Sequence, residues 1–314
     1  MIARYNLDGL LKKLSIAYLA VGGVSGGGMF TKIVPKDQGQ EYDLIFINVP
    51  DDNTMRILTE TKASCILLEA IWGQQCLSEI EKLEKRIYLV AHPRLVIAKL
   101  MKHMYERTED KPYGIHPTAI VDRKADIHKS VFIGPYCVIG NCLIGSKSQI
   151  YAHAIINDYV RIGKNVTIRE HCVIGSHGFA FPRDDKGTLL RLTHIGGVII
   201  EDNVEIFPFS NVDRGTFGDT VIESGTKIDH YVHVGHNSRI ERDCFIAAGV
   251  VFCGSSTIGA KSWAGVGSII KQSTKVGRCV TLGLGAVVIK DVDDGDTVAG
   301  VPAKSLQKKM RRKV

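Results

Sequence analysis

An aliphatic residue returns at every sixth position through most of the chain after residue 114. The series runs in four blocks, Ile115–Ile139, Ile144–Ile174, Ile200–Val212 and Ile222–Val288, separated by short slips and one longer interruption. A period of six fits neither the 3.6-residue repeat of an amphipathic helix nor the strict alternation of an open sheet. Each hexad therefore predicts one short strand followed by a turn.

Repeated hexads are typical of a parallel β-helix, in which three hexads, about 18 residues, make one coil. The series is long enough for between eight and nine coils. A small residue stands four positions after many of the aliphatic ones, and it predicts a second inward position in each hexad, as at Ala119, Ala154 and Val166. Cys137, Cys172 and Cys244 occupy this place, so we expect them to act as small hydrophobic core residues.

Residues 1–112 lack the six-residue period and predict a separate α/β domain. Apolar runs at 44–49 and 65–68 are strand-like, whereas 77–83 and 95–104 have helical spacing. The Lys-Pro-Tyr-Gly segment around Pro112 marks the expected boundary. The β-helix is expected over 113–300, followed by a short helical, basic tail over 301–314.

Composition narrows the class of protein. No apolar run reaches the length of a membrane-spanning helix, and the segment after Lys13 lacks a clear signal-peptide cleavage site. Eight cysteines without a CxxC pair favour reduced thiols, and we expect a cytoplasmic protein. The net charge of +7 favours phosphorylated small molecules as partners without requiring nucleic acid.

The histidines gather in two places. His230, His233 and His236 resemble a metal site on paper, but consecutive hexads lie on different faces, so we predict no metal site within one chain. His153 and His171 are expected to stack on successive coils about 4.8 Å apart, either as the wall of a site or as an ordinary surface ladder.

Several motifs carry a specific resemblance. The segments IGSHGFAF (174–181), SNVDRGTFGDTVIESGTKIDHYVHVGHN (210–237) and FIAAGVVFCGSSTIG (245–259), with a non-repeating loop after Gly178, resemble the UDP-3-O-acylglucosamine N-acyltransferase family. The resemblance covers the repeats almost throughout. It implies a left-handed β-helix that forms a homotrimer, with active sites between subunits.

The same resemblance implies site residues. The GHN element implies that His236 is the general base, and an imidazole suits this task because its pKa lies near neutral pH. The amide of Gly254, one coil further, is implied as the oxyanion donor. Asp213 or Asp229 is expected to orient the imidazole. The residues expected to bind the sugar nucleotide are His177, Asn211, Arg214, His233, Asn237 and, in the N-terminal domain, Phe46 and Asn48. For Phe46 and Asn48, a place in a core strand and its exit turn has equal weight.

The sequence also departs from that family. Ser273 stands where the family has a second histidine, and the ending VTLGLGAVVIKDVDDGDTVAGVPAK resembles acyl-coenzyme A-dependent sugar transferases. We therefore expect N-acyl transfer from acyl-CoA to a nucleotide-linked amino sugar, such as a 4-amino-4,6-dideoxyhexose, with Lys290 and Lys304 meeting the phosphates of the coenzyme.

Three alternatives stay open at this stage. The first is the family's own reaction, the N-acylation of UDP-3-O-acylglucosamine for lipid A with acyl carrier protein as donor. The second is a β-helix carbonic anhydrase, which collects its histidines from neighbouring subunits and is distinguished by zinc content. The third is a non-catalytic protein that binds nucleotide sugars, because a fold alone does not prove a function.

Overall fold

The computed structural model describes residues 4–22, 28–83, 85–105 and 114–306. The chain divides into two compact units, Met1–Lys111 and Pro112–Val314. No helix among these described residues is both long and apolar enough to cross a membrane. The Gly-rich residues 23–27, the predicted boundary segment and the end of the basic tail lie outside the described residues.

The N-terminal unit is built on a five-stranded sheet in the order β2-β7-β6-β5-β4, in which only β2 is antiparallel to its neighbour. A further antiparallel pair joins β1 to β3. Both runs predicted as strands are present, as β5 and β6. The strands are β1 (Tyr5–Asn6), β2 (Leu19–Val21), β3 (Met29–Phe30), β4 (Lys32–Ile33), β5 (Asp43–Ile47), β6 (Cys65–Glu69) and β7 (Arg86–Val90).

Helices cover both faces of this sheet. The helices are α1 (Leu7–Lys13), α2 (Thr54–Glu60), α3 (Ala70–Gln75), α4 (Leu77–Ile80) and α5 (Pro93–Tyr105). Alternate residues of the central strands point to opposite faces, so Leu67 packs in one core with residues of α1 and α5, and Leu68 packs in another with residues of α2 and α4. The predicted helices at 77–83 and 95–104 correspond to α4 and α5.

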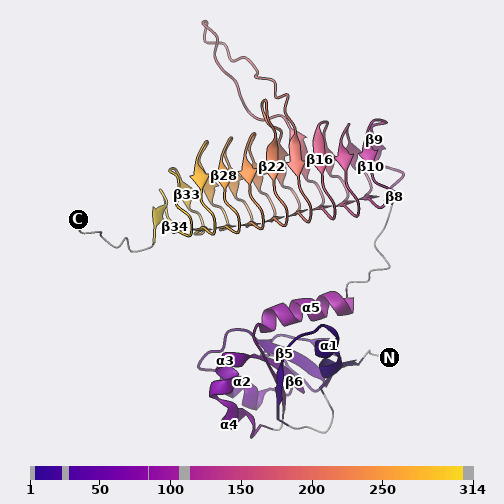
Figure 1. Ribbon diagram of the computed structural model, residues 1–314, viewed down its shortest axis with the longest axis vertical. Helices are drawn as coiled ribbons and strands as arrows, with labels where there is room; N and C mark the ends of the chain where they lie inside the picture. The colour runs from indigo at the N-terminus through magenta and orange to yellow at the C-terminus, as the bar shows by residue number, and fades with distance from the viewer. Residues whose placement is uncertain (1–3, 23–27, 84, 106–113, 307–314) are drawn as a thin grey trace, which may run out of the picture. The chain divides into compact units, whose positions relative to one another are not determined.

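The second unit is a parallel β-helix of three long sheets (Figure 1). Sheet I has eight strands, sheet II has eleven and sheet III has nine. Each coil passes through the three sheets in turn, so strands that are adjacent in a sheet come from successive coils. For example, Ile150 pairs with Ile168, eighteen positions on. The expected coil of three hexads is confirmed.

The strands of the β-helix are mostly two residues long. Sheet I contains β10 (Asp126–Ile127), β13 (Leu143–Ile144), β16 (Val160–Ile162), β19 (Val198–Ile200), β22 (Thr220–Ile222), β25 (Arg239–Ile240), β28 (Thr257–Ile258) and β31 (Lys275–Val276). Sheet II contains β8 (Gly114–Ile115), β11 (Phe132–Ile133), β14 (Gln149–Ile150), β17 (Thr167–Ile168), β20 (Glu205–Ile206), β23 (Lys227–Ile228), β26 (Phe245–Ile246), β29 (Trp263–Ala264), β32 (Thr281–Leu282), β34 (Thr297–Ala299) and β35 (Lys304–Ser305). Sheet III contains β9 (Ile120–Val121), β12 (Val138–Ile139), β15 (Ile155–Ile156), β18 (Val173–Ser176), β21 (Asn211–Asp213), β24 (His233–Val234), β27 (Val251–Phe252), β30 (Ile269–Ile270) and β33 (Val287–Val288).

The second residue of most strands points inward and stacks on its equivalent in the coil below. Ile150, Ile168 and Ile206 are examples, and all three are fully buried in one continuous core. The predicted cysteine fillers lie in this core as well. Burial raises the pKa of the Cys172 thiol to about 11 and that of Cys244 to about 12, so both remain neutral thiols.

The corners of the coils place many side chains in the left-handed backbone region, with φ near +60°. At the corner between sheets II and III, Tyr136, His153, His171, Phe209 and Tyr231 form a continuous ring stack. The centroids of His153 and His171 are 4.8 Å apart with nearly parallel planes, which confirms the predicted stacking.

The C-terminal end differs from the prediction. The expected helical tail is replaced, over its described part, by the short strand β35, which pairs antiparallel with β34. Gly300 adopts a positive φ of 91° and the chain reverses there, so the backbone of Lys304 and Ser305 completes sheet II instead of starting a helix.

Candidate functional site

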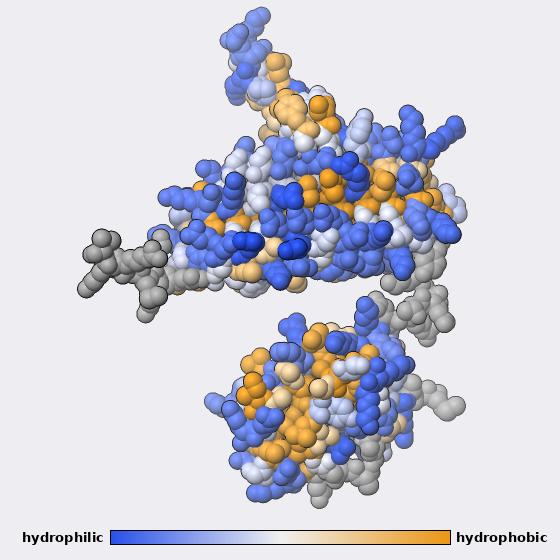
Figure 2. All heavy atoms as spheres, viewed as in Figure 1, coloured by the Kyte–Doolittle hydropathy of each residue, from blue (hydrophilic) through white to orange (hydrophobic). Residues whose placement is uncertain are grey.

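A long loop leaves the β-helix between β18 and β19, at the corner that joins sheet III to sheet I, and projects away from the coils (Figure 1). This loop, residues 177–197, matches the non-repeating segment of the sequence. Hydrophobic side chains gather where it leaves the coils (Figure 2). The loop also exposes the side chains of Phe181 and Leu192. The same corner, two coils further on, carries His236, which follows β24 after Gly235.

The ring of His236 is held by polar groups at its Nδ1 atom. Nδ1 lies 3.0 Å from Oδ1 of Asn237 and 3.3 Å from Oγ1 of Thr216. Oδ1 of Asn237 also accepts a hydrogen bond of 2.9 Å from the backbone N–H of Thr216. An amide oxygen only accepts, so Nδ1 carries the hydrogen and donates it to Asn237. The Nε2 atom is therefore left with a lone pair, as a general base requires.

Gly254 lies directly against this Nε2 atom. A Cβ placed on Gly254 would be 2.6 Å from Nε2 and 2.7 Å from Cε1 of His236. The carbonyl of Gly254 accepts from the backbone N–H of Ser273, but among the described residues no hydrogen bond uses the N–H of Gly254. A base and an unused backbone donor thus lie side by side, the pairing that acyl transfer through a tetrahedral oxyanion requires.

The other side of His236 is closed by the projecting loop. A Cβ on Gly178 would lie 2.8 Å from Nε2 of His194 and 2.9 Å from Cδ2 of His236. The rings of His194 and His236 have centroids 5.1 Å apart and are inclined by 69°, and His177 is a further ring 6.2 Å from His194. Glycine at 178 is what allows the loop to pack this closely against the imidazole.

Neither aspartate expected to orient His236 does so, and this prediction is corrected. Oδ1 of Asp229 is 2.6 Å from Nδ1 of His230. Oδ1 of Asp213 accepts from Ser176 and Asn211 at 2.7 Å. Among the described residues, Asn237 takes the orienting role because it follows His236 in a left-handed corner, with φ of 60°, and its short side chain returns to the ring.

The three histidines of the IDHYVHVGHN segment have different partners. His230 pairs with Asp229, and Nε2 of His233 lies 3.7 Å from Oδ2 of Asp213. Nδ1 of His233 is 3.3 Å from the amide of Asn211. Within the described ranges, no three His, Cys, Asp or Glu side chains are arranged to hold a metal ion.

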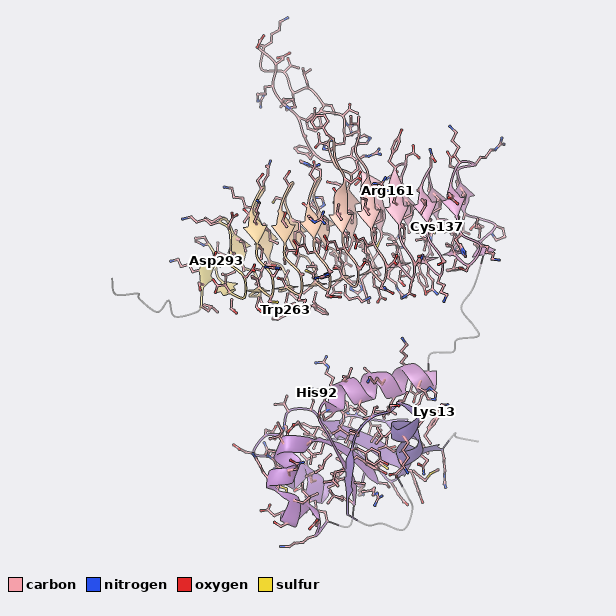
Figure 3. All side chains as sticks on the ribbon, viewed as in Figure 1. Lys13, His92, Cys137, Arg161, Trp263 and Asp293 are labelled. Atoms are coloured by element: carbon pink, nitrogen blue, oxygen red, sulfur yellow. The ribbon has the colours of Figure 1, made fainter. Side chains whose placement is uncertain are left out.

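A hollow of about 480 Å³ lies beside this corner, toward the N-terminal coils. Its lining includes Ser176, His177, Arg191 and Arg214. The guanidinium of Arg214 is buried and donates to the carbonyls of Gly196 and Asp158, and it lies over the ring of Tyr159. Arg161, labelled in Figure 3 near the base of the loop, pairs with Asp219 at 2.6 Å. Two of the predicted substrate-binding residues, His177 and Arg214, therefore share one cavity.

The remaining predicted residues lie elsewhere. Phe46 is half-buried in β5 and packs against a core of the N-terminal unit. Oδ1 of Asn48 accepts a 3.1 Å hydrogen bond from the backbone N–H of Arg94 at the start of α5. These contacts fit a core strand and its exit turn, the alternative given for these two residues. Lys290 and Lys304 are exposed near the last coils.

Sequence reasoning missed two residues that contact or enclose His236. Thr216 directly follows the VDRG element, and this position is the only feature of the sequence that points to a role near His236. His194 lies in the non-repeating loop, where the hexad period gives no information about which side chains return to the coils.

Comparisons with known proteins agree with this geometry. Residues 141–176 and 219–254 match the family model described as bacterial transferase hexapeptide (six repeats). A UDP-3-O-acylglucosamine N-acyltransferase of Coxiella burnetii is 33% identical over 70% of this chain and 67% of its own. UDP-3-O-acylglucosamine N-acyltransferase 1 of Gloeobacter violaceus is 32% identical over 90% of this chain and 85% of its own.

Solved structures show the same fold. The UDP-N-acetylglucosamine O-acyltransferase of Moraxella catarrhalis superposes with a TM-score of 0.55 at 27% identity, covering 61% of this chain and 73% of that one. The Francisella novicida UDP-N-acetylglucosamine acyltransferase gives 0.56 at 30% identity, over 61% and 68%. With the hexad coils and an imidazole base beside a backbone donor, these likenesses show that the chain is an acyltransferase of the hexapeptide-repeat class and belongs to the UDP-3-O-acylglucosamine N-acyltransferase family.

Proposed function

We propose that the chain transfers an acyl group from a thioester to the amine of a 3-O-acylated UDP-glucosamine. The observation that carries this proposal is the pairing of His236 Nε2 with the unused N–H of Gly254. The comparisons support this acceptor better than our first expectation of a dideoxy amino sugar, because the Gloeobacter relative bears the UDP-3-O-acylglucosamine name and matches 85% of its length.

In the proposed reaction the amine nitrogen attacks the thioester carbonyl carbon directly. Nε2 of His236 takes a proton from the nitrogen as the C–N bond forms, and Asn237 stabilises the resulting imidazolium by accepting from Nδ1. The N–H of Gly254 donates to the oxyanion of the tetrahedral intermediate. The C–S bond then breaks, and the thiolate receives the proton from His236. The step needs no covalent acyl-enzyme.

The acyl donor is the second part of the proposal. The relatives' names specify N-acyl transfer to a nucleotide-linked sugar and leave the carrier unnamed. We propose acyl carrier protein as the donor, and acyl-CoA is the alternative that the test must include. A homotrimer, expected from the resemblance, is part of the proposal.

The test is thioester consumption by the purified full chain. The donors are 3-hydroxyacyl carrier protein, 3-hydroxyacyl-CoA and acetyl-CoA, and the acceptors are 3-O-acylated UDP-glucosamine and a dTDP-linked dideoxy amino sugar. We expect turnover with the UDP acceptor and a loss of roughly 10²–10⁴ in kcat for His236→Ala. Turnover only with the dideoxy sugar would overturn the proposed acceptor. An unchanged rate in His236→Ala would overturn the mechanism.

A further inference from the structure

The loop brings a buried histidine to the site that the mechanism above does not use. His194 is 1% exposed, and its Nδ1 lies 3.0 Å from the carbonyl oxygen of Leu192. A carbonyl only accepts, so Nδ1 carries the hydrogen and Nε2 carries the lone pair. That Nε2 atom is buried without a hydrogen-bond partner among the described residues. Buried polar atoms are normally paired, so an unpaired one calls for an explanation.

Nε2 of His194 and the ring of His236 pack against the same side of Gly178. Nε2 of His194 and Cδ2 of His236 both lie within 3 Å of the position that a Cβ on Gly178 would take, at 2.8 and 2.9 Å. The rings meet edge to face, with centroids 5.1 Å apart. The unpaired Nε2 of His194 and the ring of His236 are therefore neighbours.

Backbone hydrogen bonds attach this part of the loop to the segment that contains Thr216, which contacts His236. The N–H of Ile195 donates to the carbonyl of Thr216 at 2.8 Å, and the N–H of Gly196 donates to that of Gly215 at 3.0 Å. Thr216 in turn bonds Asn237 and lies next to Nδ1 of His236. His194 is thus attached to the His236–Asn237–Thr216 cluster through one residue of backbone.

We propose that His194 is a positioning residue for this acyl transfer, in which its neutral ring and unprotonated Nε2 stabilise the imidazolium that His236 becomes. The inference rests on the proposed function, because it needs His236 to gain a proton during the reaction. A lone pair in a buried, low-dielectric place attracts a neighbouring positive charge more strongly than it does in water.

The surrounding charges are consistent with a neutral His194. Burial lowers the pKa of His194, and the neighbouring His236 and His177 lower it further, whereas the bond to Leu192 and the charge of Asp213 act in the opposite direction. A proton on His194 would place a second cation against His236. The ring therefore keeps the lone pair that the proposal requires.

The experiment separates a lone-pair role from simple packing by comparing two substitutions in the full chain. His194→Phe keeps an aromatic ring and removes the acceptor, while His194→Gln removes the ring and keeps an acceptor oxygen near the position of Nε2. We expect His194→Phe to lower kcat roughly tenfold with KM changed less than about threefold, and His194→Gln to stay within about threefold of the wild type in kcat. His171→Phe, an exchange within the ring stack of another corner, is the matched control and should leave kcat unchanged.

The opposite order, with His194→Phe active and His194→Gln impaired, would mean that the ring only fills space and would overturn the proposal. Thermal unfolding of both variants shows whether either has lost its fold. If His194→Phe is unfolded, the kcat of His194→Gln against His194→Leu decides, and equal losses in these two would reject the acceptor role. His236→Ala is assayed in parallel. Its activity tests the general base, whereas the His194 variants test only the positioning role, so failure of one proposal can be told from failure of the other.

Discussion

Replacing Gly254 by alanine tests the geometry around His236 with a single methyl group. The new Cβ would lie 2.6 Å from Nε2 and 2.7 Å from Cε1 of the imidazole. Non-bonded heavy atoms are most stable at about 3.5–4.0 Å, so the ring has to move by roughly 1 Å. The backbone N–H is retained, and the φ of Gly254 is not in the left-handed region, so the substitution itself does not strain the chain.

A displacement of about 1 Å at a reacting group can cost roughly 10²-fold in rate. We therefore expect Gly254→Ala to lower kcat about 10²-fold, with a loss of about 1–3 kcal/mol in the free energy of unfolding, as for other overpacked sites. The assay is thioester consumption at saturating acceptor, together with urea unfolding followed by circular dichroism.

Gly218→Ala is the matched control. Gly218 lies in the connection between β21 and β22, its φ is not left-handed, and a Cβ there would meet nothing within 4 Å. This variant should retain full turnover. If Gly254→Ala were folded and kept kcat within about threefold, the reasoning would be refuted, because Nε2 of His236 would not then need its present place.

Three further predictions concern other contacts. Asn237→Gly suits the left-handed corner but removes the acceptor for Nδ1 of His236, so kcat should fall roughly 10- to 100-fold, whereas Asn237→Asp, which keeps an oxygen there, should lose less. The pKa of His194 is lowered by burial, so the unfolded chain binds a proton more readily than the folded one, and stability should fall as the pH drops below about 6.5; urea unfolding at two pH values should show a smaller drop for His194→Phe. Nζ of Lys85 donates to the carbonyls of Leu58, Thr59 and Thr61 at the end of α2, so Lys85→Met should lower the free energy of unfolding by about 1–3 kcal/mol in denaturant titration, unlike Lys82→Met on the surface.

The hexad period was sufficient to predict the coils, because each aliphatic residue buries itself against its equivalents eighteen positions away. Ile150 and Ile168, for example, pair in adjacent coils and are both buried in the core. The same spacing of eighteen positions predicted the stacked rings of His153 and His171. It also placed Gly254 one coil beyond His236, and the structure brings the two into contact.

The partners of His236 depended on tertiary structure. Asp213 and Asp229 are near His236 in the sequence and chemically suited to orient it, but both bond to other side chains. The adjacent Asn237 reaches Nδ1 of His236 instead, because its backbone is left-handed. His194 is 42 positions from His236 in a loop without a repeat, and only the backbone bonds to Thr216 and Gly215 bring it to the ring. The six-residue repeat determines which residues stack in successive coils. The non-repeating loop is positioned by tertiary contacts, and these cannot be predicted from the repeat.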